Sequence, residues 1–384
     1  MKRYLQKYIR DDLKSKMVFI GGPRQVGKTT LALSLSGVDT PLKGSLPSSY
    51  INWDLAADKE NIVKGILPGN EELIILDEIH KYTHWRNLVK GLYDKYHSRT
   101  SFIITGSARL DYYSRGGDSL HGRYHYYRLH PFSLSEIDSD CHPDALSDLL
   151  EYGGFPEPFL AMDKRKMRRW QRERLHRVIH EDLRGLEHIN EISLLEVMID
   201  SLPKRIGSPL SLNSLREDLQ VSHETVRRWM NILENMYLGY FVAPYTSKGT
   251  EKIRVVKKEK KFYLWDWSVC LDNVVRFENL VASNLLKFCH FKEDWEGYKM
   301  DLRYLRNRAG KEIDFVVLQD GRPLFAVECK WRKTILDPSV KYFESRLPEI
   351  PLFFQVHTGK ADYLTDKKIR VLPFTTLCRE LSLP

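Results

Sequence analysis

The chain has few cysteines and no long apolar runs for its length of 384 residues. Its longest apolar runs, such as residues 73–76, are far too short to cross a bilayer, and residues 1–6 lack the apolar core of a signal peptide. No internal repeat or low-complexity tract is evident. The cysteines lack the paired spacing of a disulfide framework or a zinc finger: Cys141, Cys270, Cys289, Cys329 and Cys378. We therefore expect a cytoplasmic protein with reduced cysteines and no membrane partner.

The length and charge of the chain predict several domains and a polyanionic partner. A chain of 384 residues exceeds what one hydrophobic core normally supports, so two or three domains are expected. The formal net charge is +9, and the excess falls in blocks such as residues 164–169 and 257–261. This distribution favours DNA as a partner, although surface lysines and arginines also simply keep a protein soluble.

A glycine-rich segment predicts a nucleotide site. Residues 22–29 read Gly-Pro-Arg-Gln-Val-Gly-Lys-Thr between a strand-like run at 16–20 and a helical run at 30–35, which is typical of a phosphate-binding loop. Lys28 would supply a cation for the outer phosphates, and Thr29 would offer a hydroxyl to magnesium. We predict binding of ATP with Mg²⁺, the alternative being a turn without a ligand. The residues predicted to hold the nucleotide are Gly22, Pro23, Arg24, Gln25, Val26, Gly27, Lys28, Thr29 and Thr30.

Polar residues follow further runs that are typical of buried parallel strands. Residues 73–76 are followed by Asp77 and Glu78, and residues 101–105 are followed closely by Ser107. Ligands of open α/β sheets bind at the carboxyl ends of the strands, so these side chains should converge on the phosphates. Asp77 would hold Mg²⁺, usually through water, and Glu78 would orient and polarise the attacking water. Ser107 would sense the γ-phosphate, or else cap the segment that follows it.

Two other polar features lie near this predicted site. Arg123 is a candidate arginine finger that would stabilise transition-state charge across a subunit boundary, with an ordinary surface arginine as the alternative. His80 and His84 lie four residues apart, but no third ligand is evident, and residues 85–92 have the apolar spacing of an amphipathic helix. We therefore predict no metal site at these histidines.

A second group of charged residues lies nearer the C-terminus. Residues 312–318 and 324–330 are strand patterns joined by a turn. With a loop of about three residues, Asp314 would lie opposite Glu328, and Lys330 would share their face. Buried carboxylates need a counterion, and a divalent cation is the natural one.

This arrangement suits cleavage of a phosphodiester. Asp314 and Glu328 would hold Mg²⁺, which lowers the pKa of a bound water, and Lys330 would position that water or stabilise the developing charge. Glu278, on a predicted helix over residues 277–286, would add an acidic ligand. The alternative is a salt-bridged Glu–Lys edge with an unrelated aspartate. A cationic rim that favours DNA would border the scissile phosphate, formed by Arg303, Tyr304, Arg306, Asn307, Arg308 and Lys311.

The segment between the two sites predicts a helical DNA-binding module. Residues 165–186 form a basic helical pattern that would belong to a lid or connector. Residues 210–219 and 222–234 predict two helices with a tight turn and Ser222 as N-cap, followed by a strand and a basic loop, as in a winged helix-turn-helix. Its groove-facing side chains would be His223, Arg227 and Arg228. The same module would also suit packing or oligomerisation.

Several motifs together resemble a large prokaryotic family of AAA+ ATPases, over essentially the whole chain. They are the loop at 22–29, Leu-Asp-Glu-Ile at 76–79, Ile-Thr-Gly-Ser at 104–107, Gly-Arg at 122–123, Pro-Phe-Ser-Leu-Ser-Glu at 131–136 and Gly-Gly-Phe-Pro-Glu at 153–157. The order Glu278, Asp314, Glu328-Cys329-Lys330 is similar to the PD-(D/E)xK nuclease superfamily. The resemblance implies assembly as a homo-oligomeric ring, with a hexamer as one candidate size.

The resemblance implies an α/β fold with four parts in order. These are a P-loop AAA+ ATPase core (1–140), a helical lid and connector (141–192), a winged helix-turn-helix (193–256) and a restriction-endonuclease-like α/β domain (257–384). The leading hypothesis is an ATP-hydrolysing, DNA-binding AAA+ protein with a magnesium-dependent nuclease domain. One alternative is an ATP-driven DNA-remodelling or branch-migration motor whose nuclease fold does not cut. A further alternative is a nucleotide-dependent regulatory switch.

Overall fold

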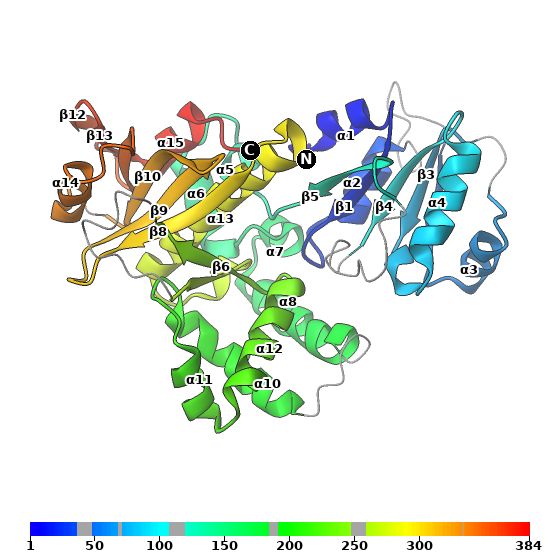
Figure 1. Cartoon of the computed structure of the whole chain (residues 1–384), viewed down its shortest axis with the longest axis horizontal. Helices are drawn as coiled ribbons and strands as arrows, with labels where there is room; N and C mark the ends of the chain where they lie inside the picture. The colour runs from blue at the N-terminus through cyan, green and yellow to red at the C-terminus, as the bar shows by residue number, and fades with distance from the viewer. Residues whose placement is uncertain (37–47, 68–70, 107–119, 184–190, 247–258, 333) are drawn as a thin grey trace. The chain divides into compact units, whose positions relative to one another are not determined.

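The computed structural model describes residues 1–36, 48–67, 71–106, 120–183, 191–246, 259–332 and 334–384 (Figure 1). The chain forms two compact units, Met1–Pro131 and Phe132–Pro384. In the part of the chain described, no helix combines the length and the apolar character that a membrane crossing requires.

The first unit is built on a parallel sheet. Its strands lie in the order β2–β3–β4–β1–β5, and all neighbouring pairs are parallel. The strands are β1 (Met17–Gly21), β2 (Ser48–Asn52), β3 (Leu73–Asp77), β4 (Ser101–Thr105) and β5 (Tyr124–Arg128). The helices are α1 (Gln6–Asp12), α2 (Lys28–Leu35), α3 (Ala56–Val63), α4 (Trp85–Tyr96) and the short η1 (Ile79–Lys81). Helices lie between successive strands from β1 to β4, as the crossovers of a parallel sheet require.

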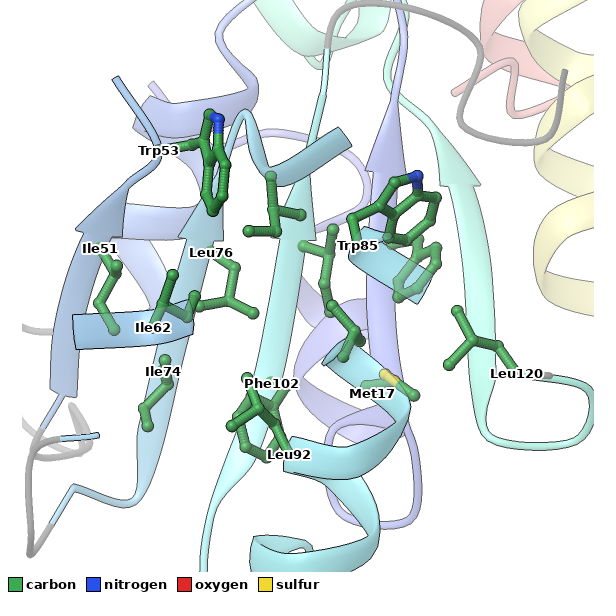
Figure 2. Packing of buried hydrophobic residues seen from close by; sticks show 14 residues of the cluster. Met17, Ile51, Trp53, Ile62, Ile74, Leu76, Trp85, Leu92, Phe102 and Leu120 are labelled. Atoms are coloured by element: carbon green, nitrogen blue, oxygen red, sulfur yellow. The ribbon is translucent and has the colours of Figure 1, made fainter. Parts of the chain in front are cut away.

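The core of this unit lies on the face of the sheet that α3 and α4 cover (Figure 2). Alternate side chains of the strands, such as Ile74 and Leu76 on β3, pack there against Trp85 and Leu92 of α4. The helix over residues 85–92 is thus confirmed, and its apolar stripe is the reason that it docks. Both faces of β1 and β3 are buried, so both strands are built of apolar residues and glycine, with Asp77 at the carboxyl end of β3 as the one polar residue.

The second unit begins with helices. They include α8, which carries the predicted basic pattern, and α12, which Ser222 caps by accepting a hydrogen bond from the Thr225 N–H. The helices up to the first strand are α5 (Leu134–Ile137), α6 (Pro143–Tyr152), α7 (Pro156–Ala161), α8 (Lys164–Arg177), η2 (Val178–Leu183), α10 (Ile192–Ser201), η3 (Leu202–Arg205), α11 (Leu212–Leu219) and α12 (His223–Asn235).

A mixed sheet forms the rest of the second unit. The strand order is β12–β13–β11–β10–β9–β8–β6–β7. The strands are β6 (Gly239–Pro244), β7 (Lys261–Leu264), β8 (Met300–Arg306), β9 (Glu312–Gln319), β10 (Arg322–Lys330), β11 (Phe353–His357), β12 (Tyr363–Asp366) and β13 (Ile369–Pro373). The helices that accompany them are η5 (Trp267–Val269), α13 (Asn273–Glu296), α14 (Pro338–Glu344) and α15 (Phe374–Glu380). The long helix α13 packs against β8, β9 and β10.

Strand β6 links the predicted winged-helix segment to the sheet. It pairs with β7 antiparallel and with β8 in parallel, so a strand from residues 193–256 belongs to the same sheet as the strands from 257–384. The bounds of the four predicted domains stay predictions. The basic loop predicted after β6 lies outside the described residues.

The hairpin of β9 and β10 differs from the prediction in its turn. Its loop has two residues, Asp320 and Gly321, rather than three, and both have positive φ angles, 51° and 77°. Gln319 pairs with Arg322, but a bulge between Pro323 and Phe325 shifts the register by one residue. The predicted loop length was wrong, and the extra residue instead lies inside β10.

The bulge decides which side chains meet. Beyond it Phe315 pairs with Val327, so the next residues are Asp314 and Glu328. Without the bulge, Asp314 would lie opposite Val327, and the carboxylate of Glu328 would point to the other face of the sheet.

Candidate functional site

The residues of the predicted phosphate-binding loop form a tight turn from β1 into α2. Gly27 is the N-cap of α2 with φ 95°. Gly22 has φ 138°, and a Cβ there would come within 2.4 Å of the Leu129 carbonyl oxygen. Glycine is therefore required at both positions for the backbone conformation, and at Gly22 also for space. The turn leaves backbone N–H groups at the N-terminus of α2, where anions bind favourably.

The Lys28 ammonium lies against this loop. It donates to the carbonyl oxygens of Gly22 at 3.1 Å and Pro23 at 2.7 Å, and the residue is buried. A nucleotide bound in the loop would therefore find the cation already beside it, as phosphate recognition requires.

Asp77 and Thr29 are in direct contact at the carboxyl end of the sheet. The Thr29 hydroxyl donates to Asp77 Oδ2 at 2.9 Å, and Asp77 is buried. A hydroxyl and a carboxylate this close are oxygen donors of the kind that Mg²⁺ prefers, so the donor set fits this ion. The structure thus brings together the two residues predicted to hold magnesium with the nucleotide.

Two residues that the sequence reasoning missed hold Asp77 in place. The Tyr50 hydroxyl, on β2, donates to Asp77 Oδ2 at 2.7 Å, and the Thr105 hydroxyl, at the end of β4, donates to Oδ1. Burial and the Asp77 carboxylate raise the pKa of the Tyr50 phenol, so it remains a donor. The signal for Thr105 was its place at the polar end of a strand that pairs with β3.

Glu78 follows Asp77 in a constrained backbone conformation. Its φ is 56°, which is uncommon for a residue with a Cβ, and its N–H donates to the Thr105 carbonyl at 3.2 Å. Its Oε2 lies 3.6 Å from His80 Nε2 and 3.7 Å from Lys81 Nζ. Burial raises the pKa of Glu78 above its ordinary value.

The buried neighbour of Glu78 is a neutral histidine. Burial lowers the pKa of His80 to about 4, so its ring is uncharged at pH 7. Its Nδ1 is buried and has no hydrogen-bond partner among the described residues.

Arg3, near the N-terminus, contacts the phosphate-binding loop. Arg3 is buried and donates through Nη1 to the Val26 carbonyl at 2.8 Å and through Nη2 to the His130 carbonyl. A single arginine therefore ties the phosphate-binding loop to the segment after β5. This role has no sequence motif and was not predicted.

One predicted nucleotide residue, Arg123, is not brought to this site. Ser107 lies outside the described residues. Arg123 precedes β5, at the end of the sheet where Tyr124 pairs with Met17, whereas the loop follows the opposite end of β1. Its Nε donates to Asp94 Oδ1 at 2.8 Å. Within one chain Arg123 is thus remote from the loop, and a finger role would have to act on a neighbouring subunit.

In the second unit, the structure brings Asp314, Glu328 and Lys330 together. Glu328 Oε1 lies 2.7 Å from Lys330 Nζ, and Glu328 Oε2 accepts a hydrogen bond from the Asp314 N–H at 3.3 Å. Asp314 Oδ2 in turn accepts from the Cys329 N–H at 2.8 Å. Lys330 also pairs with Asp337 at 3.1 Å, and the pKa of Asp337 is lowered to about 2, with hydrogen bonds and this cation outweighing its desolvation.

A lysine that the sequence reasoning missed lies beside these carboxylates. Lys261, the first residue of β7, has a fully buried side chain. Its Nζ lies 3.4 Å from Asp314 Oδ1, 3.4 Å from Glu278 Oε1 and in closer contact with Glu312 Oε1. In the sequence, Lys261 belongs to a basic run, residues 257–261, which is typical of an exposed segment. One signal pointed to burial: Lys261 lies two residues before Tyr263 in a strand pattern, and residues two apart share one face of a strand.

Burial dominates the protonation of the cluster. Desolvation raises the pKa of Glu278 to about 7, and it raises the pKa of Glu328 well above its ordinary range. The Lys261 ammonium opposes this shift at Glu278 and is itself held charged, because its three carboxylate neighbours raise its pKa despite burial.

The predicted metal ligands of the second unit do not lie within reach of one shared ion. Among the described residues, three potential ligands gather closely enough for one ion only at Asp138, Asp140 and His142, on the exposed surface. Glu278 is separated from Asp314 by the Lys261 ammonium, to which both are paired.

The predicted cationic rim is not one continuous surface. Tyr304 is fully buried and donates to the Glu259 carbonyl at 2.6 Å, so the prediction that it belongs to a surface rim was wrong. Arg303 pairs with Asp301, and Arg306 pairs with Glu312 at 3.1 Å. A cavity of about 420 Å³ remains, lined by Ser208, Pro209, Glu259, Arg306, Asn307, Arg308 and Gly310.

The predicted groove-facing residues lie on the solvent side of α12. His223, Arg227 and Arg228 are exposed, whereas Val226 and Trp229 are buried beneath them. The amphipathic pattern thus leaves a basic face open.

Known proteins resemble this chain in consecutive stretches. Residues 14–138 match an AAA domain. After the AAA domain, residues 143–275 and 276–377 match two families described as domains of unknown function, DUF8612 and DUF4143. With the parallel sheet and the loop at Lys28, this match supports an ATPase of the AAA+ type with a mixed α/β fold.

Relatives cover most of the chain at low identity. An uncharacterised protein of Haemophilus influenzae is 24% identical over 84% of this chain and 85% of its own length. One of Methanocaldococcus jannaschii is 23% identical over 90% of this chain and 83% of its own.

Among solved structures, the Aeropyrum pernix ORC1 protein in complex with DNA matches with a TM-score of 0.35 and 14% identity, covering 73% of this chain and 93% of that chain. Domain III of the Thermotoga maritima replication initiation protein DnaA matches with a TM-score of 0.28 and 16% identity, covering 50% and 89%.

Proposed function

We propose that the first unit hydrolyses ATP in the presence of Mg²⁺. The observation that carries this proposal is the 2.9 Å contact between Thr29 and Asp77, next to the loop that holds Lys28. Thr29 and Asp77 would hold Mg²⁺, directly or through water, and the bound ion would supply positive charge to the β- and γ-phosphates. Lys28 would turn from the loop carbonyls to the phosphates and stabilise the charge that develops during transfer.

Glu78 would act on the attacking water. Its carboxylate would accept a hydrogen bond from the water and orient the oxygen toward the γ-phosphorus. The new P–O bond forms as the bond to the β–γ bridging oxygen breaks, which yields ADP and inorganic phosphate. The raised pKa of Glu78 makes the carboxylate a better proton acceptor than an exposed glutamate.

Phosphate release by the full chain tests this proposal. Lys28→Ala should abolish nucleotide binding and turnover. Glu78→Gln should retain binding, while turnover falls by a factor on the order of 10². Ser34→Ala is the matched control, because Ser34 lies on α2 and its hydroxyl donates to the Leu31 carbonyl of the same helix. A wild-type chain that binds ATP and Mg²⁺ but releases no phosphate would contradict the proposal.

We further propose that the second unit binds DNA and that the chain assembles as a homo-oligomeric ring. The exposed cations of α12 and the basic helix α8 support DNA binding through a winged helix-turn-helix. The isolation of Arg123 from the loop of its own chain is consistent with a role at a neighbouring subunit. Sedimentation with a non-hydrolysable ATP analogue would report the subunit number. A chain that remains monomeric would rule out both the ring and the finger.

Cleavage of DNA at Asp314, Glu328 and Lys330 is a second candidate function. One observation favours it, namely the convergence of these three side chains beside a bulged hairpin. It requires Mg²⁺ at the carboxylates, and the cation already paired with Asp314 is Lys261. Nicking of supercoiled plasmid by wild type but not by Asp314→Asn would establish cleavage.

A further inference from the structure

Lys261 occupies the position in the carboxylate cluster where a counterion belongs. Its side chain is fully buried, and its Nζ contacts Glu278, Glu312 and Asp314. A buried lysine is stable only when its charge is compensated, and three carboxylates compensate it amply. The cation demanded by the buried acidic groups is therefore part of the chain itself.

The carboxylate oxygens of Asp314 and Glu328 all have protein partners. Asp314 Oδ1 faces Lys261 and Oδ2 accepts from the Cys329 N–H. Glu328 Oε1 faces Lys330 and Oε2 accepts from the Asp314 N–H. A divalent ion would have to displace several of these contacts and to approach an ammonium that shares the same oxygens, in a region of low dielectric.

The backbone of Lys261 is paired on both sides, which keeps its side chain beside the carboxylates. It pairs with Val242 on β6 and forms a bridge to Pro209, so its Cα is held from both sides. Its ammonium also lies 5.5 Å from the centre of the buried Tyr304 ring. The side chain therefore cannot turn to solvent without opening the edge of the sheet.

Two ion pairs connect Lys261, through Glu312, to Arg306 at the surface. Glu312 contacts Lys261 through Oε1 and Arg306 through Oε2, at 3.1 Å for the latter. Arg306 lines the cavity of about 420 Å³ together with Arg308 and Asn307. The cluster thus fixes the orientation of a surface arginine, a role that needs no metal.

We propose that the Lys261 ammonium is the permanent counterion of the Glu278, Glu312 and Asp314 carboxylates and stands in the place of a divalent ion, so that the native cluster binds no Mg²⁺ or Mn²⁺. The second unit then engages its partner with fixed charges and does not cut a phosphodiester by a metal-dependent route. This inference is independent of ATP hydrolysis by the first unit, so either can fail without the other.

Thermal unfolding of the nucleotide-free full chain, with and without Mn²⁺, tests the proposal. Mn²⁺ should not raise the Tm of wild type by more than it raises the Tm of Asp314→Asn. Lys261→Ala should lower Tm by about 10 °C, because it leaves buried carboxylates unpaired. Mn²⁺ should restore most of the loss, because the three carboxylates, which the ammonium no longer holds apart, can draw together on the ion. Failure of Mn²⁺ to restore a folded Lys261→Ala chain would overturn the claim that the ammonium stands in a cation site.

Lys287→Ala is the matched control. Lys287 is also fully buried, and it contacts the Glu136 carboxylate and the Ser133 hydroxyl. Its loss should lower Tm by a similar amount, and Mn²⁺ should not restore it, because Glu136 is not one of the three carboxylates around Lys261.

A second measurement does not depend on the folding of Lys261→Ala. Electron paramagnetic resonance counts Mn²⁺ bound to wild type and to Asp314→Asn. Equal counts are expected. One ion bound to wild type and absent from Asp314→Asn would overturn the proposal and favour cleavage.

Discussion

At the scale of single residues, both sites depend on hydrogen bonds that hold one charged group in place. Asp77 accepts from three hydroxyl groups, those of Thr29, Tyr50 and Thr105. Of these three, only Thr29 was predicted from the sequence to act together with Asp77. The other two come from neighbouring strands and keep the carboxylate oriented toward the phosphate-binding loop.

Removal of the Tyr50 hydroxyl should therefore affect magnesium use. We expect Tyr50→Phe to reduce ATP turnover roughly tenfold and to weaken the apparent Mg²⁺ affinity, because Asp77 loses a charge-assisted hydrogen bond. Magnesium titrations of ATPase activity would measure both effects. Tyr93→Phe is the control, since its hydroxyl makes only a 3.4 Å contact with the Ser15 carbonyl. Equal behaviour of the two variants would exclude a positioning role for Tyr50.

His80 should make stability depend on pH. Its pKa is about 4 in the folded chain and 6.5 ordinarily, so the unfolded chain binds a proton that the folded chain excludes. Stability from this group is therefore complete above pH 6.5 and is lost as pH falls toward 4. The difference of about 2.5 units corresponds to roughly 3 kcal/mol.

Urea unfolding at several pH values checks this expectation. His80→Gln should flatten the fall in the free energy of unfolding between pH 6.5 and pH 4, and the two chains should share the remaining slope. A variant with the same pH dependence as wild type would mean that His80 is protonated in the folded state.

At the scale of elements, the β9–β10 hairpin shows how backbone geometry sets chemistry. Its two-residue turn and its bulge together bring Asp314 opposite Glu328. A three-residue loop would have the same consequence, so the predicted pairing was right although the loop was wrong. One extra residue shifts the register in the same way whether it lies in the turn or in β10. Its position therefore does not change which residues lie opposite each other beyond it.

Two glycines outside the sites allow a test of backbone conformation. Gly321→Ala should destabilise the chain by about 1 kcal/mol, because the φ of 77° is unfavourable for a residue with a Cβ, and nothing crowds the new methyl group. Gly91→Ala, on α4 in equally open space but without a positive φ, should stabilise by about 0.5–1 kcal/mol. Denaturant titration measures both. Changes of the same sign would contradict the assignment of the effect to φ.

At the scale of the whole molecule, the lysines and arginines that give the net charge of +9 differ in whether solvent can reach them. Lys28, Lys261 and Lys287 are buried with partners, so these cations are not on the surface that DNA would meet. Exposed cations such as Arg227 and Arg228 remain for DNA binding. Because carboxylates such as Asp77 and Glu328 are buried as well, the net charge alone does not say which cations DNA would meet.

The exposed cations of α12 should control the salt dependence of DNA binding. We expect the affinity of the full chain for duplex DNA to fall as salt rises, because bound counterions are released. Arg227→Ala with Arg228→Ala should lower the slope of log K against log salt by about 1.8, that is about 0.9 for each phosphate that the variant no longer neutralises. Fluorescence anisotropy measures this slope, and ATP turnover without DNA should not change. An unchanged slope would exclude α12 as the DNA-binding face.

Features that depend on local order along the chain can be predicted without the fold. The loop at residues 22–29 needs its glycines, lysine and threonine in immediate succession, and β1, β3, β4, α2 and α4 follow from apolar spacing. The cap at Ser222 and the basic face of α12 are equally local.

Which charges neutralise one another depends on how distant strands pack together. Lys261 meets Glu278, Glu312 and Asp314 because β7 lies at the edge of a sheet, next to β6 and near the start of β9, and residues 17 to 53 positions away come into contact. A lysine in a basic run carries no local mark of burial, since burial depends on the strands that pack around it. The identity of the counterion, lysine or magnesium, is for this reason a property of the fold.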